Sequence, residues 1–160
     1  LLTASLSASV IHLFEGTIEQ VVALAVLMPI VAGLGGNAGT QALTVVVRAI
    51  ATGEVAGLSS ARILARELIV GLGNGLGVAV VAALAAAAWF NNPVIGLILG
   101  LALLMNLIVA ALVGSAVPLA FRALNLDPAT GSSVFVTPAT DMTGFAVFLG
   151  LATLMLAYLQ

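Results

Sequence analysis

The chain contains no cysteine and no lysine, and only 6% of its 160 residues are charged. Without cysteine it can form no disulfide, no thiolate metal site and no cysteine nucleophile. A soluble domain typically carries about 25% charged residues, so this chain has too few to cover a surface in water. With four arginines and a net charge of −2, it also has no basic patch for nucleic acid. These shortages exclude a soluble protein and a nucleic-acid-binding one.

The chain is instead rich in apolar residues, which make up 62% of it and give a mean hydropathy of +1.31. This composition predicts an all-α membrane protein embedded in the lipid bilayer, with helices of about 20 or more apolar residues as spans. We expect five transmembrane helices, the first of them incomplete, with residues 51–66 as a polar connection. The expected spans are residues 1–14 (partial), 18–50, 67–90, 94–122 and 130–159.

The four arginines predict how the helices are oriented in the membrane. Arg48, Arg62 and Arg66 flank the connection between the second and third spans, and Arg122 flanks the one between the fourth and fifth. With five spans, all four fall on the side of the N-terminus. The positive-inside rule makes that side cytoplasmic and places the C-terminus outside the cell membrane.

Asp141 is the acidic residue that lies deepest in a predicted span, the fifth. An ionised carboxylate in hydrocarbon costs at least ~2.5–3.5 kcal/mol, so its side chain needs a cavity or a partner. Helical spacing places Thr130, Ser133, Thr137 and Gly144 on the same stripe as Asp141. This stripe predicts a polar face, although a protonated Asp141 hydrogen-bonded between helices is an alternative interpretation.

The second span carries a matching stripe in a segment rich in glycine. Residues 29–41 contain four glycines, a proline and two amide side chains, all of them costly choices inside an apolar helix. Gly33, Asn37, Thr40 and Thr44 recur every three or four residues and therefore share one face. Two such stripes facing each other predict an oxygen-lined path for ions.

The chemistry of these stripes favours a hard cation. No arginine falls centrally in a predicted span to neutralise Asp141, so a passing cation is its expected counter-charge. Oxygen ligands suit Mg²⁺, Ca²⁺ or Na⁺, and Mg²⁺ sheds its water reluctantly, so a site with one or two carboxylates suits hydrated Mg²⁺. In a two-fold homodimer with Asp141 near the axis, two carboxylates would meet one ion.

At these residues the chain resembles the transmembrane domain of the MgtE magnesium transporter family. The resemblance covers essentially the whole chain, including Gly-Gly-Asn-Ala-Gly-Thr-Gln41, Leu126-Asp127-Pro128 and Thr140-Asp141-Met-Thr-Gly144. It implies a homodimeric, Mg²⁺-selective channel whose pore, at the two-fold axis, is formed by the second and fifth spans. The implied metal-contacting positions are Asp141, Asn37, Thr137 through its backbone carbonyl, Gly33 and Ser133, although Ser133 departs from the Asn expected there.

The resemblance also implies which parts of the family's architecture this chain represents. Family members carry an acidic N-terminal domain, paired CBS modules and a plug helix ahead of the first span, and these sense cytosolic Mg²⁺. We expect residues 1–160 to be a single pore domain without those regulatory domains, with Mg²⁺ as its transported ion and pore ligand. Asp127 resembles an acid at the cytoplasmic mouth that takes part in Mg²⁺ contacts with the regulatory part.

Three other functions are alternatives to a magnesium channel. A secondary transporter coupled to protons or sodium would use Asp141 as its carrier. An intramembrane aspartyl protease needs two acids that share a proton, and in the predicted spans only Asp141 qualifies, so no enzyme is expected. An inert membrane anchor would tolerate the loss of Asp141.

Overall fold

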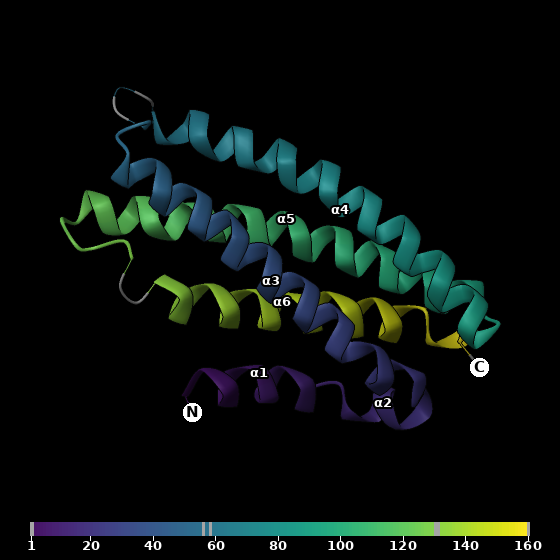
Figure 1. Ribbon diagram of the computed structural model, residues 1–160. Coiled ribbons are helices and arrows are strands. Elements are labelled where there is room, and N and C mark those ends of the chain that lie inside the picture. Colours follow the sequence, from purple (N-terminus) through teal and green to yellow (C-terminus); the bar gives the residue numbers. More distant parts are fainter. Residues whose placement is uncertain (1, 56, 58, 130–131, 160) are drawn as a thin grey trace.

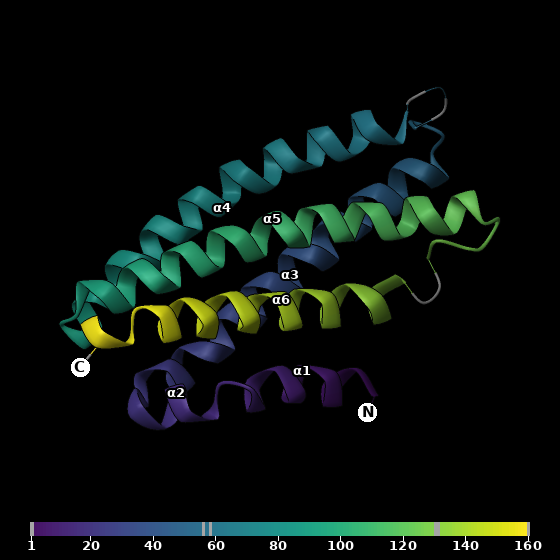
Figure 2. The same ribbon diagram turned by 180° about the vertical axis from the view of Figure 1, so that it is seen from behind.

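The computed structural model describes residues 2–55, 57, 59–129 and 132–159, and every regular element within them is a helix. Four long helices form a bundle, and the two short N-terminal helices lie along one side of it, with α1 packed against α6 (Figures 1 and 2). The elements are α1 (Leu2–His12), α2 (Glu15–Gln20), α3 (Ala23–Ala51), α4 (Ser60–Phe90), α5 (Pro93–Ala123), α6 (Ser132–Leu154) and a final 3-10 turn, η1 (Leu156–Tyr158).

The four long helices, α3 to α6, are each long and apolar enough to cross a membrane, which makes the chain a multi-pass membrane protein. Helix α1 has 11 residues and is roughly 17 Å long at 1.5 Å per residue. That length is about half of the ~30 Å hydrocarbon core of a bilayer. Helix α1 is therefore too short to span the bilayer by itself, and the five spans stay a prediction.

The helix bounds differ from the predicted spans in two places. Residues 60–66, expected in a polar connection, form the first two turns of α4. The N-cap of α4 is Ser59, whose hydroxyl accepts a hydrogen bond from the Arg62 backbone N–H. A hydroxyl at this position satisfies a backbone donor that would otherwise lack a partner. Residues 18–22, expected at the start of the second span, hold the end of α2 and the turn into α3.

Helix α5 is the centre of the bundle. In its most apolar 18-residue window 61% of the residues are buried, compared with 17–33% in the other three long helices. Its apolar side chains pack with those of α3 and α6 into one core, which includes Leu24, Ile98, Leu103 and Phe148. The outward side of α4 keeps large apolar residues exposed, among them Val81 and Leu84, as expected of a surface that faces lipid.

Small residues allow the helices to approach each other closely. A Cβ on Gly71 of α4 would lie 2.6 Å from the Cβ of Ala111 on α5, and a Cβ on Gly114 of α5 would lie 2.5 Å from the carbonyl oxygen of Gly39 on α3. Contacts of this kind are typical of membrane helices, where close backbone packing replaces the hydrophobic effect between helices.

Asn106 ties three of the helices together. This residue of α5 is fully buried, and its side-chain N–H donates a hydrogen bond of 3.0 Å to the carbonyl oxygen of Val31 on α3. Its amide occupies the space left by Gly35 on α3 and by Gly144 on α6. Because a buried amide is costly without a partner, this contact favours one relative position of α3, α5 and α6.

Candidate functional site

The predicted residues of α6 line one groove. Ser133, Thr137 and Asp141 lie along the side of α6 that faces α1, and the groove between the two helices has a volume of about 490 Å³. Helix α1 contributes the hydroxyl residues Thr3 and Ser7 to its lining. We call this space the Asp141 groove.

Asp141 has an unusual electrostatic setting. Its side chain is partly buried, and it is the one ionisable residue among the described residues that line the groove. Within the described part of the chain, no arginine or histidine lies within ion-pair distance of its carboxylate. The groove thus holds one negative charge among hydroxyls, a setting that suits a cation or ordered water.

The predicted stripe on α6 is only partly correct. Ser133 and Thr137 share the groove with Asp141, but Gly144 is buried against Asn106 and Val31 in the interior. Helix α3 crosses α6 obliquely (Figure 1), so the covered side of α6 changes along its length, which helical spacing alone does not reveal. Thr130, also placed on the stripe, lies outside the described residues.

The predicted stripe on α3 forms a second polar surface. Asn37, Thr40 and Thr44 are exposed and, with Gln41 and Val45, line an open hollow of about 530 Å³. Gly33 lies one turn before Asn37, is also exposed, and has open space where a Cβ would be.

Several hydroxyl groups of α3 and α6 are oriented by their own helices. Thr40 and Thr44 each donate a 2.8 Å hydrogen bond to the carbonyl four residues earlier, which leaves their oxygen lone pairs as acceptors. Thr140 donates a 2.8 Å hydrogen bond to the carbonyl of Thr137. This hydrogen bond uses one lone pair of the Thr137 carbonyl oxygen, so fewer lone pairs remain to contact an ion or its water.

The two polar surfaces belong to helices in contact. A Cβ on Gly36 of α3 would lie 3.9 Å from the side-chain methyl group of Thr137 on α6. Because Gly36 directly precedes Asn37, the polar surface of α3 starts next to the contact between α3 and α6. The structure thereby places Gly33, Asn37, Ser133, Thr137 and Asp141 on exposed or partly buried faces of two crossing helices.

Asp127 lies apart from these five residues. It is exposed in the segment between α5 and α6, and its carboxylate accepts a 2.9 Å hydrogen bond from the backbone N–H of Ala129. That segment lies at the same end of the bundle as the α3–α4 connection (Figure 1). The arginines occur at this end too, in the last turns of α3 and α5 and the first turns of α4.

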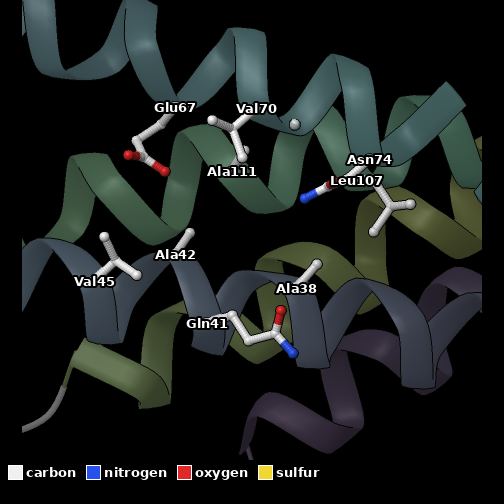
Figure 3. A pocket seen from close by; sticks show the side chains of 10 residues that line it. Ala38, Gln41, Ala42, Val45, Glu67, Val70, Asn74, Leu107 and Ala111 are labelled. Atoms are coloured by element: carbon white, nitrogen blue, oxygen red, sulfur yellow. The ribbon is translucent and has the colours of Figure 1, made fainter. Parts of the chain in front are cut away.

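Sequence reasoning missed three polar residues. Thr3 and Ser7 are spaced four apart, which could have signalled a hydroxyl face on α1. Glu67 begins the third predicted span, where a solvated side chain is the default expectation, but on α4 it is only 9% exposed and lines a cavity beside α3 and α5 (Figure 3). This cavity shares no lining residue with the Asp141 groove, so the two acids do not form a protease dyad.

Comparison with known proteins gives consistent matches. The MgtE family model, described as a divalent cation transporter, matches residues 28–151, which include Gly33, Asn37 and Asp141. The magnesium transporter MgtE of Bacillus subtilis is 33% identical over 148 residues, covering 92% of this chain and 33% of that protein. The magnesium transporter MgtE of Enterococcus faecalis is 31% identical over 152 residues, covering 95% of this chain and 34% of that protein. That of Thermus thermophilus is 33% identical over 156 residues, covering 98% of this chain and 34% of that protein. The chain spans about a third of the length of these curated relatives.

Proposed function

Because the chain belongs to the MgtE family of divalent cation transporters, we propose that two copies of it form a passive pathway for hydrated Mg²⁺ across the cell membrane. The observation that carries this proposal is Asp141, a partly buried carboxylate in a long apolar helix, without an ion-pair partner in the described chain. Such a charge is too costly to leave against lipid. A cation that passes through a wet path compensates for it.

A two-fold homodimer would supply the other wall of this path. The α3 and α6 surfaces are polar and open on a single chain, and lipid would leave their amides and hydroxyls without hydrogen-bond partners. A two-fold axis places the same surface opposite itself. Two Asp141 carboxylates then attract one divalent ion from either side.

We assign the other residues to the hydration shell of the ion. Gly33, Asn37 and the carbonyl of Thr137 would accept hydrogen bonds from its water molecules, and Ser133 would contribute a hydroxyl one turn away. Binding through water is selective for a small divalent ion, yet weak enough for release. Asp127 would attract cations at the mouth, since its exposed charge lies at one end of the bundle.

The arginine-rich end of the bundle is proposed to be cytoplasmic, by the positive-inside rule. The N-terminus would then be inside and the C-terminus outside, as expected for five spans. Mg²⁺ would move inward, driven by the membrane potential. In a longer protein, N-terminal and CBS regulatory domains would contact this end and control opening.

A flux measurement distinguishes a passive Mg²⁺ pathway from a secondary transporter coupled to protons or sodium. The protein in liposomes should carry Mg²⁺ down its gradient at a rate unaffected by an imposed proton or sodium gradient. If uptake instead requires either gradient, the pathway is a secondary transporter with Asp141 as carrier.

The dimer can be tested by cross-linking, since the chain has no native cysteine. Thr137→Cys should be joined into covalent dimers by a short bifunctional thiol reagent, because the two copies of Thr137 would face each other across the axis. Leu84→Cys is the control, because Leu84 on α4 is 67% exposed and would face lipid. Cross-linking measured on denaturing gels at position 84 but not at position 137 would contradict the proposed axis.

A further inference from the structure

A cavity of about 250 Å³ lies between α3, α4 and α5, apart from the Asp141 groove. Figure 3 shows Glu67 and Asn74 reaching into it from α4, and Gln41 on the opposite side, on α3. Leu107 and Ala111 of α5 close its back. One water molecule occupies roughly 30 Å³ in the liquid, so the cavity has room for several. We call it the Glu67 cavity.

Glu67 gives the cavity an acidic side chain that forms no ion pair in the described part of the chain. Its side chain is 9% exposed, and no arginine or histidine in the described part of the chain lies within ion-pair distance of it. No described residue donates a hydrogen bond to its carboxylate either. Burying an ionised carboxylate in this way is costly unless something compensates for the charge.

The cavity lies next to a hollow at the arginine-rich end of the bundle. Glu67 and Val45 also line this neighbouring hollow of about 290 Å³, whose charged lining residues are Arg48, Glu54, Arg62 and Arg66 besides Glu67. Glu67 is the eighth residue of α4 and lies roughly 10 Å from the start of the helix, at 1.5 Å per residue. Helix α4 is longer than the ~30 Å hydrocarbon core, so an ion from water can reach Glu67 without crossing lipid.

We propose that the Glu67 cavity binds a hydrated hard cation, at a site separate from the Asp141 groove. Its polar lining consists of one carboxylate and the two side-chain amides of Gln41 and Asn74, and oxygen ligands of this kind suit Mg²⁺ or Na⁺. With one carboxylate and space for water, the ion keeps much of its hydration shell. The cation supplies the positive counter-charge that the Glu67 carboxylate otherwise lacks.

Gln41 links this site to the surface of α3 that carries Asn37. Its side chain lines both the Glu67 cavity and the hollow formed by Asn37, Thr40 and Thr44. A cation in the cavity would attract the side-chain carbonyl oxygen of Gln41, which makes this residue the one shared between the two spaces.

Calorimetric titration of Mg²⁺ into the protein in lipid nanodiscs tests this site. Glu67→Gln should weaken one class of binding by at least about tenfold, because an ionic ligand becomes a neutral one, while the class that depends on Asp141 persists. Glu54→Gln is the matched control, since it removes an exposed charge at the same end from outside the cavity. Equal loss in both variants, or no loss in Glu67→Gln, overturns the proposal and leaves the Asp141 pathway untouched.

Two further measurements keep the test decisive if Glu67→Gln folds poorly. Asn74→Leu removes an amide but no charge, and should also weaken the Asp141-independent class. Infrared difference spectra of Asp141→Asn should show a carboxylate band that shifts when Mg²⁺ is added, in choline buffer or in sodium buffer. If the band shifts in choline buffer but not in sodium buffer, Na⁺ already occupies the same site and competes with Mg²⁺. If the band shifts in neither buffer, the proposal is overturned.

Discussion

Asp141→Asn is expected to reduce Mg²⁺ uptake into liposomes by about 100-fold. In the proposed dimer it removes two negative charges from one ion path. If each charge-assisted contact contributes about 1.5 kcal/mol, losing both costs about 3 kcal/mol, close to two factors of ten. The substitution is nearly isosteric, and Asp141 is only partly buried in an open groove, so the fold should be kept.

The control for Asp141→Asn is Glu19→Gln. Glu19 is an exposed acid of α2 and does not line the Asp141 groove. Glu19→Gln changes the net charge by the same amount as Asp141→Asn. Because Glu19 lies outside the groove, uptake should stay near that of the unmodified protein. If Asp141→Asn transports normally, Asp141 has no role in conduction, and an inert anchor or another path becomes the better explanation.

Gly114→Ala is expected to cause a large loss of stability for a change of one methyl group. The added Cβ would lie 2.5 Å from the carbonyl oxygen of Gly39, 2.9 Å from the Cβ of Ala42 and 3.2 Å from the backbone nitrogen of Leu43. Two of these atoms belong to the backbone of α3 and cannot rotate away. Overpacking of this kind costs about 1–3 kcal/mol, so the thermal unfolding midpoint in detergent should fall.

Gly73→Ala is the matched control, because no atom lies within 4 Å of the position where its Cβ would be. Both variants add one methyl group within a long helix, so any difference reflects packing between helices. We also expect Gly114→Ala to slow Mg²⁺ flux, because displacing α3 moves the Asn37 surface. Equal midpoints for the two variants would show that α3 and α5 are less closely packed than the structure indicates.

The long helices and the polar face of α6 could be predicted because both follow from local patterns. Apolar length determines where a helix can cross the bilayer, so α3 to α6 agree with the predicted spans to within a few residues, apart from the two boundaries above. Helical periodicity places Ser133, Thr137 and Asp141 together, and they share a groove. The roles of these residues in binding Mg²⁺, like the dimer, are still predictions.

What could not be predicted depends on how helices cross. Gly144 has the spacing of the Asp141 stripe, yet α3 and α5 cover it with Val31 and Asn106. Glu67 follows Arg66 in a segment that reads as solvated, yet α4 starts at Ser60 and turns this carboxylate toward α3. In both cases the environment of the side chain is set by a neighbouring helix that is distant in sequence.

The most direct test of the account is the position of a bound divalent ion in an experimental structure of the protein in lipid, with Mn²⁺ as an electron-dense substitute for Mg²⁺. We predict ion density on a two-fold axis between two copies, with both Asp141 carboxylates facing it through water. Density elsewhere, with Asp141 enclosed between α1 and α6 of one copy or turned toward lipid, would contradict the central claim.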